Sequence, residues 1–182
     1  MGIVLLGPPG SGKGTQGTRL ADALGVRHLS TGDVLRAEVA EGSELGDRVA
    51  PYLESGELVP DDLLLEVVEH ALAEAGKAGG YVLDGFPRTA AQVEHLPVDD
   101  LAIYLQLPDD VARTRLMDRS EGRVDDDDPE IVDRRLAVYH EQTAPLLDIY
   151  RRRGRLVTVN GDQPPEDVAT AVGAAVAAAD DR

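Results

Sequence analysis

A glycine-rich segment near the start of the chain constrains the fold more than any other feature. The sequence GPPGSGKGT runs from Gly7 to Thr15, directly after an apolar run from Gly2 to Gly7, and it opens a helical stretch from Lys13 to Leu24. Glycines let the backbone take positive φ values and approach a ligand closely. A strand, a glycine-rich loop with a lysine, and a helix in that order are typical of a phosphate-binding loop. We therefore predict a phosphate site in an α/β fold.

The rest of the chain alternates apolar runs with helical stretches, which predicts a three-layer fold: a mostly parallel sheet of five strands with helices on both faces. We expect the strands at Gly2–Gly7, Arg27–Ser30, Gly80–Leu83, Leu101–Leu107 and Leu156–Val159. We expect the helices at Lys13–Leu24, Asp33–Glu41, Leu45–Glu54, Asp61–Ala75, Thr89–Leu96, Asp109–Arg119, Pro129–Arg153 and Glu166–Ala179. Ligands of such sheets bind beyond the carboxyl ends of the strands, where the glycine-rich loop, Asp84 and Asn160 lie.

Four residues are expected to shape the ends and bends of these helices. Asp61 is predicted to cap the helix that it begins, and Gly154 to close the helix that ends near Arg153. Proline removes a backbone donor and clashes with the preceding turn. Pro51 should therefore kink or shorten its helix, and Pro145 should kink the long one.

The charge of the chain excludes several classes of partner. The formal net charge is −16, and the 18 basic residues include only two lysines, Lys13 and Lys77. Such a surface repels nucleic acid and anionic lipid, so we expect neither as a partner. It also repels a free nucleotide, so that a nucleotide site must be locally positive. A lysine that is scarce elsewhere and lies in the glycine-rich loop is expected to act on phosphate.

Cysteine is absent, which excludes disulfides and thiolate metal sites. No apolar run approaches the length that spans a membrane or serves as a secretion signal. We therefore expect a cytoplasmic protein, with a monomer as the default state. The histidines are scattered, and none is assigned to a metal.

Several sequence blocks, in order, resemble those of adenylate kinases, in the nucleoside monophosphate kinase family. The resemblance covers nearly the whole chain, so it is far more specific than any single motif. It is carried by Gly7–Thr15, Leu29–Arg36, Gly56–Pro60, Tyr81–Gln92, Gly122–Asp126 and Arg135–His140. In the first of these blocks Gly14, rather than Ser or Thr, follows the lysine, which weakens a GTPase interpretation.

The resemblance implies a core and two excursions from it. The core would comprise residues 1–29, 60–118 and 130–182, with an AMP-binding excursion at 30–59 and a lid at 119–129. Many relatives have a longer lid with a zinc-binding cysteine set. This lid is short and has no cysteine, so the resemblance is to the short-lid form and no zinc site is expected.

The resemblance also implies a role for particular residues. The partners would be ATP, AMP and ADP. ATP would bind Gly10, Ser11, Gly12, Lys13, Gly14, Thr15, Arg119 and Gln163. AMP would bind Thr31, Arg36, Glu57, Leu58, Val59, Gly85, Phe86, Pro87, Arg88, Gln92, Arg123 and Arg135. The catalytic residues would be Lys13, Arg88, Arg119, Arg123 and Arg135, because phosphoryl transfer needs positioned positive charge and guanidinium matches phosphate geometry.

Magnesium is expected with the nucleotide phosphates, and Asp84 is the candidate to orient it through water. An alternative role for Asp84 is to cap the corner at Gly85–Pro87. Aromatic–proline pairs at tight corners, together with the resemblance, predict a cis bond between Phe86 and Pro87. Between Arg123 and Tyr139 the chain is one residue longer than the usual spacing, so Arg134 or Arg135 could be the inward arginine. We choose Arg135, which keeps the spacing to Tyr139.

Three other functions remain as alternatives at this point. UMP/CMP kinases tend to have a smaller residue in place of Thr31 and Asn in place of Gln92, so both residues favour AMP. The donor could be GTP, because the contact expected near Gln163 is through backbone. A nucleotide-binding regulator without transferase activity would need the phosphate loop but no acceptor site.

Overall fold

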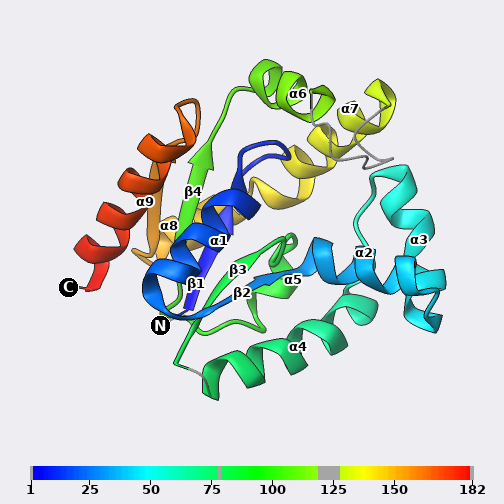
Figure 1. The fold of residues 1–182 in the computed structure, drawn as a ribbon, viewed down its shortest axis with the longest axis horizontal. Helices are drawn as coiled ribbons and strands as arrows, with labels where there is room; N and C mark the ends of the chain where they lie inside the picture. Colours follow the sequence, from blue (N-terminus) through cyan, green and yellow to red (C-terminus); the bar gives the residue numbers. More distant parts are fainter. Residues whose placement is uncertain (1, 78, 119–127, 181–182) are drawn as a thin grey trace.

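The computed structural model describes residues 2–77, 79–118 and 128–180, and it forms a three-layer α/β fold (Figure 1). The five strands pair in parallel, as the alternating sequence pattern predicts, and their order in the sheet is β2-β3-β1-β4-β5. They are β1 Gly2–Leu6, β2 Arg27–Ser30, β3 Tyr81–Asp84, β4 Leu101–Gln106 and β5 Leu156–Asn160. Leu5 of β1 lies beside Asp84 of β3, so the glycine-rich loop and Asp84 leave the sheet at the same edge.

Helices connect the strands and account for the two outer layers. They are α1 Lys13–Leu24, α2 Thr31–Glu41, α3 Glu44–Ser55, α4 Asp61–Lys77, α5 Ala90–Val93, α6 Asp109–Met117, α7 Pro129–Val138, the π-helical turn η2 Tyr139–Thr143, α8 Leu146–Arg152 and α9 Pro165–Asp180. Among the described residues, no helix is both long and apolar enough to cross a membrane.

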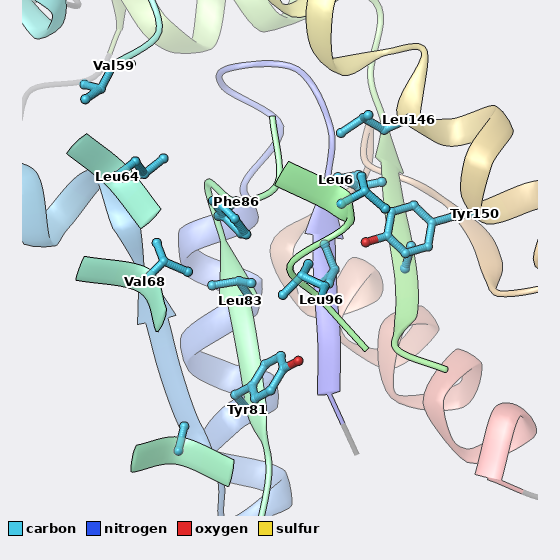
Figure 2. Close-up of a cluster of buried hydrophobic side chains, with 14 of the residues drawn as sticks. Leu6, Val59, Leu64, Val68, Tyr81, Leu83, Phe86, Leu96, Leu146 and Tyr150 are labelled. Carbon is cyan, nitrogen blue, oxygen red and sulfur yellow. The ribbon is translucent and has the colours of Figure 1, made fainter. Parts of the chain in front are cut away.

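The core has one apolar cluster on each face of the sheet, because successive side chains of a strand point to opposite faces. Ile3 and Leu5 of β1 belong to the cluster that Leu20 of α1 and Val172 of α9 complete. On the other face, Val4, Leu6 and Leu83 pack with side chains of three helices and of the segment around Leu96 (Figure 2). These are Leu64 and Val68 of α4, Val93 of α5, and Leu146 and Tyr150 of α8.

Helices α2 and α3 form a closely packed pair that extends from the sheet at one side of the molecule (Figure 1). A β-carbon on Gly46 of α3 would lie 2.2 Å from the carbonyl oxygen of Glu38 in α2. Only glycine therefore fits where the two helices meet. Leu35 of α2 and Val49 of α3 are buried and belong to the same apolar cluster as Val4. This pair occupies most of the predicted excursion at 30–59.

The sequence-based helix limits were wrong at several places. Helix α2 begins two residues earlier than expected, at Thr31, because the Ser30 hydroxyl caps it by accepting from the Asp33 N–H at 3.3 Å. Helix α3 runs through Pro51 to Ser55, so Pro51 does not shorten it. The helix expected at Thr89–Leu96 contains only Ala90–Val93, with Thr89 as its cap.

The long helix expected from Pro129 to Arg153 is three segments. Helix α7 ends at Val138, and the five-residue turn η2 follows before Pro145. The Ala144 N–H donates to the Tyr139 carbonyl at 2.8 Å, the i→i+5 bond of a π-turn. The distortion therefore begins upstream of the proline that was expected to cause it, and α8 follows it. Gly154 has the left-handed φ of 66° expected just after a helix end.

Two expectations about single residues have opposite outcomes. The bond between Phe86 and Pro87 is cis, as predicted. Asp61 begins α4 as expected, but its carboxylate accepts hydrogen bonds from Thr89 and Gln92, which are distant in sequence. The expected local capping role is therefore replaced by a long-range one.

Candidate active site

A cavity opens at the carboxyl edge of the sheet, as expected for a parallel α/β fold. Its walls come from the glycine-rich loop, the start of α2, the segment after α3, the corner after β3, and α7 with η2. Among the predicted site residues, those that line it are Gly10, Gly12, Lys13, Gly14, Thr31, Arg36, Glu57, Leu58, Val59, Asp84, Gly85, Pro87, Arg88, Gln92 and Arg135. Folding thus brings together most of the candidates that were selected from separate blocks of sequence.

The glycine-rich loop holds Lys13 over its own backbone. The Lys13 ammonium donates to the carbonyl oxygens of Gly7 at 2.8 Å and Pro8 at 2.9 Å, and lies 3.4 Å from the Ser11 hydroxyl. Gly10 has φ of 81°, and a β-carbon there would lie 2.7 Å from the Ala112 carbonyl oxygen. The loop therefore needs glycine at this position both for its backbone conformation and for its contact with α6.

Three arginines from three separate elements converge on the cavity. Arg36 lies on α2, Arg88 on the corner after β3, and Arg135 on α7. Burial lowers the pKa of Arg88 from its ordinary value, the nearby charges of Arg135 and Arg36 lower it further, and Asp84 opposes both. Arg88 is anchored because its Nε donates to the Gly85 carbonyl at 2.8 Å. The site therefore concentrates positive charge in a molecule that is otherwise strongly acidic.

Carboxylates offset part of this charge. Asp33 forms an ion pair with Arg36 one turn along α2. The carboxylate of Asp84 points toward the glycine-rich loop, since a β-carbon on Gly14 would lie 3.7 Å from its Oδ2. Within the described ranges, no group of three or more histidine and acidic side chains is placed to hold a metal ion. A cation here would therefore need ligands from a bound phosphate as well as from Asp84.

The corner after β3 is packed against the start of α2. Gly85 has φ of 84°, and a β-carbon there would lie 2.5 Å from the Thr31 hydroxyl oxygen. The Thr31 hydroxyl lies 3.4 Å from the Asp84 carbonyl oxygen, which it faces as a donor. Gln92 lines the cavity although its side chain is almost fully buried. Thr31 and Gln92, the residues predicted to distinguish AMP from pyrimidine nucleotides, thus lie in the same cavity.

The structure separates the two neighbouring arginines of α7. Arg135 lines the cavity, and its side chain lies against Gly56, just after α3. A β-carbon on Gly56 would be 2.9 Å from the Arg135 Cγ. Arg134 points elsewhere and forms an ion pair with Glu57. Of the two arginines, the one chosen from the sequence is thus the one that lines this cavity, and its role there stays a prediction.

Some predicted site residues lie away from the cavity. Phe86 is buried in the core (Figure 2). Ser11 is buried beneath the loop, and Thr15 is exposed on α1. Gln163 is exposed, although its loop borders the glycine-rich loop, since a β-carbon on Gly161 would lie 3.6 Å from the Ser11 carbonyl oxygen. Arg119 and Arg123, with the rest of 119–127, lie outside the described residues.

Sequence reasoning missed other residues that line the cavity or support it. Tyr52, Tyr139 and Thr143 are part of the lining. The Thr143 hydroxyl donates to the Arg88 carbonyl at 3.0 Å, which ties η2 to the arginine corner. Tyr139 lies in the family-like block Arg135–His140 but was given no role, and no local signal distinguishes Thr143 from a surface threonine.

Comparisons with known proteins agree with this geometry. A family model described as adenylate kinase matches residues 5–155. The chain is 45% identical over 176 residues to an adenylate kinase of Cyanothece sp., covering 91% of this chain and 90% of that protein. It is 46% identical over 187 residues to an adenylate kinase of Stenotrophomonas maltophilia, covering 97% of this chain and 99% of that protein. With the phosphate loop, the converging arginines and these matches along nearly its full length, the chain belongs to the adenylate kinase family.

Proposed function

We propose that this chain catalyses the reversible transfer of a phosphoryl group from ATP to AMP, which gives two molecules of ADP. The observation that carries the proposal is the cavity in which Lys13 of a phosphate loop meets Arg36, Arg88 and Arg135. A site for a single nucleotide needs the loop alone. The additional arginines, on three other elements, provide for the phosphate of a second nucleotide.

The donor would lie on the glycine-rich loop. Its phosphates would accept from the backbone N–H groups of Gly10 to Thr15 at the positive end of α1. Lys13 would leave its two carbonyl partners and reach the outer phosphates. The loop at Gly161 to Gln163 borders the phosphate loop and would contact the adenine through its backbone. Arg119 is proposed, from the family resemblance, to bind the donor phosphates.

The acceptor would lie between α2, the segment after α3 and the corner after β3. Arg36 and Arg88 would hold its phosphate by two-pronged hydrogen bonds. The base would lie near Thr31 and Gln92, against Glu57 to Val59, and Gln92 supplies both a donor and an acceptor. In this arrangement the two nucleotides meet end to end over Asp84.

The transfer step needs no general base from the protein. An oxygen of the AMP phosphate, which is already anionic, attacks the γ-phosphorus of ATP, and the bond from that phosphorus to the β-phosphate oxygen breaks, releasing ADP. Lys13, Arg88 and Arg135, with Arg119 and Arg123, would stabilise the charge on the transferred group. The protein must also exclude water from the cavity, because water would otherwise take the phosphoryl group.

Magnesium fits the proposed site through Asp84. The carboxylate of Asp84 faces the glycine-rich loop near Gly14, and carboxylate oxygen is a ligand that this cation prefers, directly or through water. A bound magnesium ion would neutralise charge on the donor phosphates. Asp84 would also help to hold the corner at Gly85–Pro87, since its backbone carbonyl is paired with the Thr31 hydroxyl.

A coupled assay with several acceptors tests the proposal and separates it from a UMP/CMP kinase. With ATP and magnesium as donor, we expect kcat/KM for AMP to exceed the values for UMP and CMP by at least about a hundredfold, because Gln92 and Thr31 match a purine. Higher activity with UMP would contradict the proposal. Replacing ATP by GTP in the same assay decides the donor.

We also propose that the protein acts as a monomer. The large apolar side chains that are exposed in the described part of the chain are scattered over α1, α2, α6 and one loop: Leu24, Val34, Val39, Val98 and Met117. Scattered exposed apolar residues are common on monomers and form no contiguous contact surface. Analytical ultracentrifugation should give a single species near the chain mass of 19.4 kDa.

A further inference from the structure

The side-chain amide of Gln92 is held at both ends by groups of opposite polarity. Its Oε1 accepts from the Arg88 backbone N–H at 2.7 Å, and its Nε2 donates to Asp61 Oδ1 at 2.5 Å. The second carboxylate oxygen of Asp61 accepts from the Thr89 hydroxyl at 3.0 Å. Gln92 itself is only 1% exposed, so water does not compete for these bonds. Both partners of the amide are therefore supplied by the protein.

These two partners set which way round the amide lies. A backbone N–H can only donate a hydrogen bond, and a carboxylate can only accept one. Rotating the Gln92 amide by half a turn would place its NH₂ group against the Arg88 N–H and its oxygen against the Asp61 carboxylate. Both hydrogen bonds would then be replaced by repulsive contacts in a buried environment, where unpaired polar groups are costly. Asp61 and the Arg88 backbone together lock the orientation.

The locked amide still has hydrogen-bonding capacity toward the cavity that Gln92 lines. An amide oxygen has two lone pairs and an amide nitrogen has two hydrogens, so one of each remains after the internal bonds. The remaining acceptor and the remaining donor belong to the oxygen and the nitrogen of one planar amide. Adenine presents the complement of this pair, since its 6-amino group donates and its N1 accepts. Hypoxanthine and guanine present the reverse, because their O6 accepts and their N1–H donates.

We infer that Asp61 is a positioning residue that sets the base specificity of the acceptor site by fixing the Gln92 amide for a 6-aminopurine. This inference rests on the proposed function, in which AMP binds beside Gln92. A 6-oxopurine nucleotide could pair with Gln92 only if the amide rotated against its lock. Discrimination between the two kinds of purine therefore resides in Asp61, on α4, as well as in the glutamine that contacts the base.

Comparing AMP with IMP as acceptors tests the inference in the wild-type protein. IMP differs from AMP only in this edge of the base, and it lacks the additional amino group of GMP. We expect kcat/KM for AMP to exceed that for IMP on the order of a thousandfold or more, because a site built to hydrogen-bond one edge rejects the mismatched one. A wild-type preference of less than about tenfold overturns the inference. Absence of any transfer to AMP would instead refute the proposed function.

The variants Asp61→Asn and Asp61→Ser test the role of the carboxylate. Each places at the start of α4 a neutral group that can donate as well as accept, so only the Arg88 N–H still opposes rotation of the amide. We expect the AMP-to-IMP ratio of kcat/KM to fall by about tenfold, the value of one hydrogen bond, while KM for ATP stays unchanged. Loss of overall stability alone would lower activity with both acceptors and leave their ratio intact.

Asp62→Asn is the matched control. Asp62 is the next residue in the same first turn of α4, it is exposed, and its substitution makes the same change in charge. We expect its AMP-to-IMP ratio to stay within twofold of the wild type. If Asp61→Asn and Asp61→Ser change the ratio no more than Asp62→Asn does, Asp61 does not set the specificity and the inference is wrong.

Discussion

The two ends of the same parallel sheet differ in where their charged side chains find partners. At the carboxyl end, Arg88 is half-buried near two other arginines and faces a cavity. At the amino end, the buried Asp100 accepts a hydrogen bond from Tyr81, and both side chains are enclosed by the core (Figure 2 shows Tyr81). The first arrangement places positive charge at the wall of a cavity, and the second pairs its polar groups inside the protein. Changes at the carboxyl end should therefore affect activity, and changes at the amino end should affect stability.

Arg88→Ala should have the largest effect on activity. It removes the guanidinium at the centre of the cation cluster, so we expect kcat/KM for AMP to fall on the order of a thousandfold or more, as for other arginines that serve a transferred phosphoryl group. ATP affinity, measured by calorimetry, should change little because the phosphate loop is intact. Arg151→Ala, which removes an exposed arginine paired with Asp148, is the control and should leave activity unchanged. Equal turnover of Arg88→Ala and wild type would show that Arg88 does not serve the transferred group, and absence of turnover in both would favour a regulator without transferase activity.

The neighbouring arginines of α7 sharpen the comparison within the carboxyl end. Arg135→Ala should lower kcat/KM by about ten- to a hundredfold, the value of a charged hydrogen bond to phosphate. Arg134→Ala removes only the exposed ion pair with Glu57, which contributes about 0–1 kcal/mol, so we expect at most about a fivefold change. Steady-state kinetics of the two variants, measured side by side, tests this difference. An equal decrease in kcat/KM for both would contradict the choice of Arg135 as the inward arginine.

Tyr81→Phe tests the amino end. It removes the hydroxyl that donates to the buried Asp100 carboxylate, and we expect the free energy of unfolding to fall by about 1–3 kcal/mol. Urea denaturation measures this loss. The kinetic constants at a temperature where the variant is folded should match the wild type. A change in KM for either nucleotide would show that the two ends are coupled.

The smallest expected effect is a pH dependence of stability from Asp100. Burial raises the pKa of Asp100 above its ordinary value of 3.8, although the hydrogen bond from Tyr81 lowers it in part. Between 3.8 and the raised pKa the folded protein binds more protons than the unfolded chain, so this group's contribution to stability falls as pH rises. Compared with Asp100→Asn, the wild type should lose at most about 1.4 kcal/mol per pH unit in that window. Asp62→Asn, at an exposed position on α4 whose charge does not contribute to the pKa shift of Asp100, should keep the wild-type slope.

The sequence predicted the features that depend on local pattern. Apolar runs indicated the strands other than β2, whose sequence RHLS was only a short candidate, and the order of strand, glycine-rich loop and helix identified the phosphate loop. Family-like blocks identified most of the cavity lining, although they were far apart in sequence. These predictions succeed because backbone conformation and parallel pairing follow from residue type and spacing within short segments.

Features that depend on packing between distant segments were not predictable in this way. Asp61 was interpreted as a cap, because a carboxylate at the start of a helix usually has that role, yet its partners are Thr89, the cap of α5, and Gln92 within α5. Arg134 and Arg135 are alike in sequence, and only the position of α7 against Gly56 decides which faces the cavity. Likewise the π-turn η2 forms upstream of Pro145, and its sequence YHEQT contains no residue that predicts a break in the helix.

The contact at Gly46 has a mechanical consequence. With 2.2 Å between a would-be methyl group on α3 and the backbone of α2, the two helices touch backbone to backbone and cannot slide past one another without separating. They therefore form a single stiff arm. Any movement of this arm toward the phosphate loop must bend the chain where the arm joins β2, near Ser30, and where it joins α4, after Gly56, and Arg36 would move with the arm as part of it.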